Sequence, residues 1–127
     1  AKAVRAEQLV AYPLLHREPG NAIRDLVDQF FSAAGIPFED LNVAAELGSL
    51  STVKHMAAQG FGIAIASTAA IRSAVTAGRL VGVPLSPRLH TPLEVILLKD
   101  KFRSRLVNTF ADFVTEEIGR MCATEKV

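Results

Sequence analysis

The residues with the clearest chemical potential are Gly48 and Ser49, which stand where a predicted strand ends and a predicted helix begins. Open α/β sheets hold their ligands at the carboxyl ends of strands. The unpaired N–H groups and the positive dipole end of a helix N-terminus favour a carboxylate or another anion there. Ser49 adds a hydroxyl donor, and Leu50 follows it. The pattern indicates an anion-binding edge, although Ser49 could equally serve only as the cap of its own helix.

A second polar group follows the first predicted strand and would therefore lie at the same rim as Gly48. It consists of His16, Arg17, Glu18 and Asn21. Arg17 is the natural partner for an acidic ligand because its guanidinium matches a carboxylate in charge and geometry. Loops are also polar simply because water solvates them. These four residues are therefore candidates as a group, and solvation is the competing explanation for each one.

Other chemistries are disfavoured by the sequence. Nucleophilic catalysis would need a serine or cysteine with a base, but the chain has no G-x-S-x-G elbow, and Cys122 lies near a terminus. The three histidines are widely separated and lack the spacing of a metal site. The segment 60–62, Gly-Phe-Gly, lacks the third glycine of a dinucleotide site and precedes a strand. We therefore expect no enzyme activity, no metal and no cofactor.

Composition favours one α/β domain in a reducing compartment. The chain has 127 residues, of which 50% are hydrophobic, and its formal net charge is +1. This balance argues against DNA binding by the chain itself. A single cysteine excludes an internal disulfide, which fits a cytoplasmic setting. The sequence has no apolar run long enough for a membrane helix, so no membrane contact is expected. Because Ala1 is no natural start, we expect a fragment of a longer protein.

Hydrophobic periodicity predicts strands alternating with helices. Asn21, Ser49, Ser67 and Ser104 are the expected helix N-caps, with Thr68 as an alternative to Ser67, and glycines 35, 60 and 78 are the expected stops. Alternation of this kind implies parallel pairing and right-handed crossovers. The predicted fold is α/β, a three-layer αβα sandwich with a mainly parallel sheet. The predicted strands span residues 9–16, 41–46, 61–66, 79–85 and 93–98, and the predicted helices span residues 21–34, 50–59, 67–78 and 104–121.

The order of several motifs resembles the effector-binding region of LysR-type transcriptional regulators, whose fold is that of type II periplasmic binding proteins. The matching pieces are YPLL, EPGNAIR, AAGIP, ELGSLSTVKHMAAQGFGIAIAS, AGRLVGVPL and LEVILLKDKF, and they cover nearly all of the chain. No piece is diagnostic by itself, but their order and spacing together are fairly specific. One departure is Ser67, where the family usually has proline; serine is still a good N-cap.

The resemblance implies a module that senses a small molecule, preferably an acidic one, in a cleft between two subdomains and thereby controls transcription. DNA would be read by an N-terminal winged helix-turn-helix absent from this sequence. Residues 1–127 would form one partial effector-binding domain, with about 9–90 as the second subdomain and about 91–120 as a strand and helix that return to the first. The implied effector contacts are Gly48, Ser49 and Leu50, with Ser67 and the rim residues at positions 16, 17, 18 and 21.

The alternative function is a solute-binding lobe of a transporter-associated protein, which a secretion signal upstream in the gene would favour. We also expect the chain to form a homo-oligomer, because the predicted strand 93–98 and the apolar stripe over 106–114 would lack partners supplied by the missing subdomain.

Overall fold

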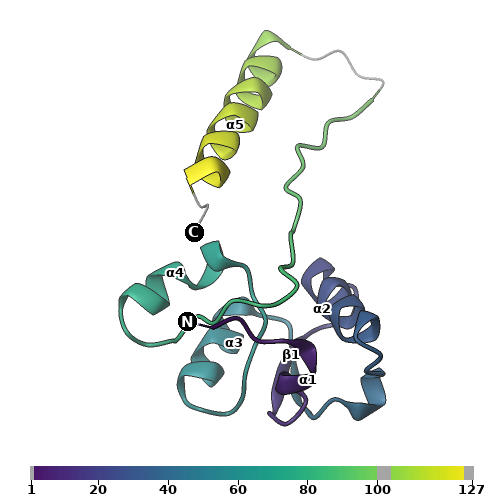
Figure 1. The fold of residues 1–127 in the computed structure, drawn as a ribbon. Coiled ribbons are helices and arrows are strands. Elements are labelled where there is room, and N and C mark those ends of the chain that lie inside the picture. The colour runs from purple at the N-terminus through teal and green to yellow at the C-terminus, as the bar shows by residue number, and fades with distance from the viewer. Residues whose placement is uncertain (1, 100–103, 125–127) are drawn as a thin grey trace. The chain divides into compact units, whose positions relative to one another are not determined.

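The computed structural model describes residues 2–99 and 104–124, and its elements are drawn in Figure 1. The chain divides into an amino-terminal unit, Ala1–Thr91, and a carboxyl-terminal unit, Pro92–Val127. The amino-terminal unit contains the helices and strands α1 (Ala6–Leu9), β1 (Leu14–Arg17), α2 (Ala22–Ala33), the 3-10 turn η1 (Phe38–Asp40), β2 (Val43–Leu47), α3 (Leu50–Ala58) and α4 (Thr68–Thr76).

Strand β1 is the centre of the parallel pairing. On one side it pairs with β2, with Leu14 opposite Val43 and Arg17 opposite Leu47. On its other side, Leu14 forms a parallel bridge with Ile63. The Leu15 amide donates to the Ile63 carbonyl at 2.8 Å, and the Ile63 amide donates to the Pro13 carbonyl at 2.8 Å. The chain thus passes from one side of β1 to the other, which makes the carboxyl end of β1 a topological switch point. The predicted parallel α/β arrangement is confirmed.

Helix α2 forms as predicted because its sequence carries a start, an apolar face and a stop. The Asn21 side chain accepts a hydrogen bond from the Ile23 amide at 3.0 Å. Val27, Phe30 and Phe31 are the buried residues of the helix. Gly35 follows with φ of +75°, a backbone conformation that glycine adopts without the clash a Cβ would cause. The helix therefore presents one apolar face to the core.

Helices α3 and α4 also begin at the predicted caps. The Ser49 hydroxyl accepts from the Thr52 amide at 3.4 Å, and the Ser67 hydroxyl accepts from the Ala70 amide at 3.3 Å. Lys54 of α3 donates from Nζ to the Ala70 carbonyl at 3.1 Å, which ties the two helices together. Both helix starts are thus capped as predicted, and one side-chain contact joins the two helices.

The hydrophobic core of the amino-terminal unit lies between α1, α2 and the middle of the sheet. Its buried members are Ala6, Leu14, Val27, Phe30 and Phe31, and partly buried aliphatic residues pack against them. The ring centroids of Phe30 and Phe31 lie 5.4 Å apart in an edge-to-face arrangement, which is a favourable geometry for aromatic pairs. Leu85 belongs to the surrounding shell, and its parallel bridge to Val4 holds the end of the unit beside its beginning.

Several predicted strands differ from the structure. The first is a four-residue strand that begins after Pro13, and residues 6–9 before it form α1. The predicted strands 61–66 and 79–85 are reduced to bridges at Ile63 and Leu85, and residues 93–98 form no strand. Val81 is 87% exposed and Ile96 is 86% exposed. Apolar alternation was the signal for these strands, but a strand also needs a neighbouring chain to accept its hydrogen bonds.

The carboxyl-terminal unit contains one regular element in its described part, helix α5 (Arg105–Thr124). As predicted, Ser104 caps it, because its hydroxyl accepts from the Val107 amide at 3.3 Å. The predicted apolar stripe is largely exposed, with Phe110 65% accessible to solvent. None of the helices in residues 2–99 and 104–124 combines the length and apolarity needed to cross a membrane.

Candidate ligand-binding site

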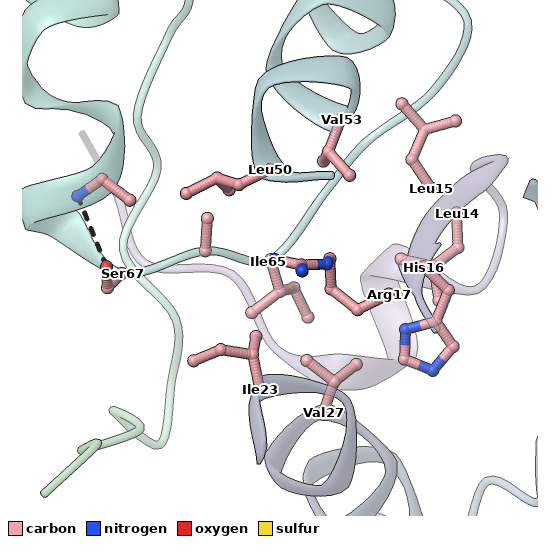
Figure 2. Close-up of a pocket in the computed structure, with 12 residues that line it drawn as sticks. Leu14, Leu15, His16, Arg17, Ile23, Val27, Leu50, Val53, Ile65 and Ser67 are labelled. Atoms are coloured by element: carbon pink, nitrogen blue, oxygen red, sulfur yellow. Dashed lines mark hydrogen bonds between the residues drawn. The ribbon is translucent and has the colours of Figure 1, made fainter. Parts of the chain in front are cut away.

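A small pocket of about 50 Å³ lies at the carboxyl end of β1. Figure 2 shows Ile23 and Val27 of α2 reaching it from one side and Leu50 and Val53 of α3 from the other. Its position is the switch point at which α/β sheets bind ligands. The residues that line it are Leu14, Leu15, His16, Arg17, Ile23, Val27, Leu50, Val53, Ile65, Ala66, Ser67 and Ala70.

Four of the eight predicted site residues line this pocket, namely His16, Arg17, Leu50 and Ser67. The other four, Glu18, Asn21, Gly48 and Ser49, do not line it. Glu18 and the Gly48 carbonyl accept hydrogen bonds from Arg17, and the Asn21 side chain donates to Glu18. The two rim segments that the sequence predicted to meet, one after each strand, do meet in the structure.

Arg17 is the residue that joins the two rim segments. Its Nε donates to Glu18 Oε2 at 2.9 Å and to the Leu47 carbonyl at 3.2 Å, and its Nη2 reaches Glu18 Oε1 at 3.2 Å and the Gly48 carbonyl at 3.5 Å. The hydrogen bond from Arg17 is the main reason why the pKa of Glu18 lies below its usual value, and a hydrogen bond from Asn21 acts in the same direction. The predicted partner for an acidic ligand thus already holds an internal carboxylate.

The predicted hydroxyl and amide ligands all cap their own helices. Asn21, Ser49 and Ser67 each accept a hydrogen bond from a backbone amide in the first turn of the helix that follows. The competing interpretation of Ser49 as a helix cap therefore describes the hydrogen bond that is present. Capping still leaves other first-turn N–H groups without an intrahelical acceptor. At α4 the N-terminal turn lies beside the pocket, because Ser67 and Ala70 both line it.

His16 lies within β1 and is buried, whereas the sequence pattern grouped it with the polar rim residues at the end of the predicted strand. It is only 2% exposed. Its Nε2 lies 2.8 Å from Asp28 Oδ1 on α2, so the imidazole has a polar partner in its buried position. A buried polar group without a hydrogen bond would be costly, and Asp28 removes that cost. His16 thus lines the pocket from within β1 while its ring is paired with Asp28.

Sequence reasoning missed an ionic cluster beneath the rim. Arg24 in the first turn of α2 pairs with Glu46 of β2 at 2.9 Å and with Asp28 at 3.5 Å. The pKa of Arg24 is raised, chiefly by the hydrogen bond to Glu46. One signal was available: Arg24 and Asp28 are oppositely charged at i and i+4 of the predicted helix. The partner in β2 had no such local signal.

The family model described as the LysR substrate binding domain matches residues 1–119. The chain belongs to this family. The family implies the periplasmic-binding-protein-like fold, in agreement with the parallel α/β arrangement of the amino-terminal unit. Within the described residues no group of three or more histidine, cysteine, aspartate or glutamate side chains is placed to hold a metal ion.

The curated relatives of this LysR-family chain are named as transcriptional regulators. It is 37% identical over 112 residues to the Escherichia coli K12 protein called "Uncharacterized HTH-type transcriptional regulator YeiE", which covers 87% of this chain and 37% of that protein. It is 30% identical over 118 residues to the transcriptional activator CmpR of Synechocystis, covering 89% and 36% respectively. BbuR of Bordetella bronchiseptica is 29% identical over 111 residues, covering 87% and 33%. The chain thus spans about a third of the length of these relatives.

Proposed function

We propose that this LysR-family chain is the effector-sensing part of a LysR-type transcriptional regulator. The observation that carries the proposal is the pocket at the switch point of β1 in a chain that matches the family over residues 1–119. A small molecule bound there would favour one arrangement of the surrounding subdomains, and transcription would follow the shifted population. DNA contact would belong to a helix-turn-helix domain outside this sequence, and the regulator would act in the cytoplasm.

The size of the pocket supports a site with a second wall. About 50 Å³ is well below the roughly 300 to 1,000 Å³ of ligand pockets. In our proposal residues 9–90 form the second subdomain of a three-layer effector domain, and residues 91–120 return to the first subdomain. The first subdomain would supply the opposite wall. The exposed apolar face of α5 agrees with such a missing neighbour.

The proposed effector is a small acid with a short apolar part. The N-terminal ends of α3 and α4 contribute Leu50, the cap residue Ser67 and Ala70 to the lining, and helix N-termini favour an anionic group. Most of the remaining lining is aliphatic, which suits a short hydrocarbon portion. Arg17 adds positive charge, but Glu18 offsets part of it. We therefore assign the main attraction for the acid to the helix N-termini.

A solute-binding lobe of a transport protein is the alternative from another class. The relatives reported above are named as transcriptional regulators, and no observation favours the transport function. Enzyme activity has no support from the site either, since its polar side chains are occupied by helix caps and internal ion pairs.

The test uses aspartate at helix caps in the complete regulator. Aspartate caps a helix as well as serine does, so Ser67→Asp should keep α4 intact while it adds a negative charge at the pocket. Ser104→Asp makes the same change at the cap of α5 and is the matched control. Binding of a panel of short mono- and dicarboxylates is measured by calorimetry. We expect Ser67→Asp to weaken the best acid by about tenfold or more, while Ser104→Asp leaves its affinity unchanged. Equal affinity in both variants, or no binding of any acid, would contradict the proposed ligand class.

A further inference from the structure

The Arg24 guanidinium contacts three separate parts of the amino-terminal unit. Arg24 belongs to the first turn of α2, and its side chain is only 12% exposed. Its Nη1 donates to the Arg17 carbonyl at 3.0 Å and lies 2.9 Å from Glu46 Oε2. Its planar group also lies 5.4 Å from the ring centre of Phe38 in η1. One side chain therefore connects the end of β1, the end of β2 and the turn between α2 and β2.

The carbonyl that Arg24 binds belongs to the residue that joins the rim. Arg17 is the last residue of β1, and its own guanidinium donates to the Leu47 and Gly48 carbonyls just before Ser49. Glu46, the ionic partner of Arg24, directly precedes Leu47. Two arginines thus connect the same pair of strand ends. Arg17 does so through its side chain, and Arg24 holds the backbone of Arg17 and the side chain of Glu46.

Arg24 is itself held in place by a second set of contacts. Asp28, one turn further along α2, lies 3.5 Å from Arg24 Nε through Oδ2 and 2.8 Å from His16 Nε2 through Oδ1. The His16 and Phe38 rings are stacked with their centroids 6.3 Å apart. A planar guanidinium can satisfy two carboxylates and a carbonyl at once, which a single ammonium group cannot do with the same geometry.

We propose that Arg24 is a positioning residue for the effector site: it fixes the spacing between the end of β1 and the start of α3, and so sets how Arg17 and the first turn of α3 face the pocket. The inference rests on the proposed function in that it takes this rim to be the effector site. Arg24 does not line the pocket, so it acts through Arg17 and Glu46 without touching the ligand. The sequence of residues 46–50 alone does not indicate that the position of this segment depends on a residue of α2.

The test compares three variants of the complete regulator by hydrogen–deuterium exchange without any effector. Arg24→Gln removes the positive charge. Arg24→Lys keeps the charge but replaces the planar guanidinium with a single ammonium group. Phe30→Leu disturbs the packing of the same helix without changing the ionic cluster. We expect Arg24→Gln to speed exchange in residues 47–53 by about tenfold, the effect of losing about one hydrogen bond. Arg24→Lys should give a smaller local increase, and Phe30→Leu should show none that is confined to this segment.

The exchange profile separates a positioning role from a merely structural one. If Arg24→Gln and Phe30→Leu raise exchange over the same residues at equal loss of thermal stability, Arg24 is only a stabilising residue and the inference fails. The outcome is also independent of the proposed function, because no ligand is used. Local loosening in Arg24→Gln, together with a regulator that binds no acid, would leave the positioning role standing and overturn the ligand class. If the regulator binds an acid but Arg24→Gln and Phe30→Leu give the same exchange profile, the ligand class stands and the positioning role of Arg24 is overturned.

Discussion

Replacement of Gly62 with alanine should destabilise the amino-terminal unit far more than the same change at Gly48. A Cβ built on Gly62 would lie 2.5 Å from the Pro13 carbonyl oxygen, 3.2 Å from the Pro13 carbonyl carbon and 3.3 Å from Leu15 Cγ. The two backbone atoms cannot move aside as a flexible side chain could. The Pro13 carbonyl also accepts the Ile63 hydrogen bond at 2.8 Å, so relief of the clash must disturb the pairing of this segment with β1.

The magnitude follows from three contributions. Overpacking of this kind costs about 1 to 3 kcal/mol, and a weakened backbone hydrogen bond adds about 0.5 to 1.5 kcal/mol. Neither Gly62 nor Gly48 has the positive φ that would strain an L residue. Alanine therefore recovers about 0.4 to 1 kcal/mol by restricting the unfolded chain. The net expectation for Gly62→Ala is a loss of about 2 kcal/mol in the free energy of unfolding.

Gly48→Ala is the matched control, because a Cβ at Gly48 meets no atom within 4 Å. It should leave stability unchanged or raise it by up to about 1 kcal/mol. Urea unfolding followed by circular dichroism measures both variants against the parent chain. The reasoning is refuted if Gly62→Ala unfolds within about 0.5 kcal/mol of the parent, which is the usual range for a neutral surface change.

Three other outcomes can be measured on the same chain. The folded-state pKa of Glu18 lies below its usual 4.5, chiefly because of the hydrogen bond from Arg17. Its contribution to the free energy of unfolding is therefore present above pH 4.5 and is lost as the pH falls through the lowered pKa. Arg17→Met should reduce this loss of stability in acid, as measured by urea unfolding at a series of pH values, and an unchanged pH profile would argue against the pairing. Gly35 has a φ of +75°, so replacing it with alanine should lower the free energy of unfolding by about 1 to 2 kcal/mol. Asparagine at the same position should lower it less. Phe110→Asp on the exposed face of α5 should reduce self-association in sedimentation experiments, and a parent chain that is monomeric at high concentration would remove the basis for this expectation.

Helix ends were the part of the fold that local sequence predicted well. The information for α2 lies within Asn21, its periodic apolar residues and Gly35, which are all close together in the chain. The starts of α3 and α4 at Ser49 and Ser67 were predicted for the same reason. Capping is a contact over three residues, so its signal is local.

Strands and ion pairs depend on distant residues and were harder to predict. The alternation of apolar and polar residues around Val81 predicts a segment with one apolar face. It does not predict whether a neighbouring strand is present to pair with that segment. Arg17 carries a charge that suits a ligand, yet only the fold shows that Glu18 and two carbonyls of the next strand and turn already occupy it. His16 was predicted as an exposed rim residue, because nothing near it in the sequence signals that it is buried. Its buried ring is paired with Asp28, which lies on another element.

The bridge between Val4 and Leu85 has a consequence for the order in which the amino-terminal unit assembles and opens. Two backbone hydrogen bonds form it, from the Val4 amide to the Pro84 carbonyl at 2.9 Å and from the Ser86 amide to the Val4 carbonyl at 2.8 Å. Closing a loop of roughly 80 residues costs about 4 kcal/mol in chain entropy, whereas two such bonds return about 1 to 3 kcal/mol. The bridge therefore forms only after the core around Ala6 and Leu14 has brought its two sides together. We therefore expect this bridge to separate on unfolding before β1 loses its neighbours.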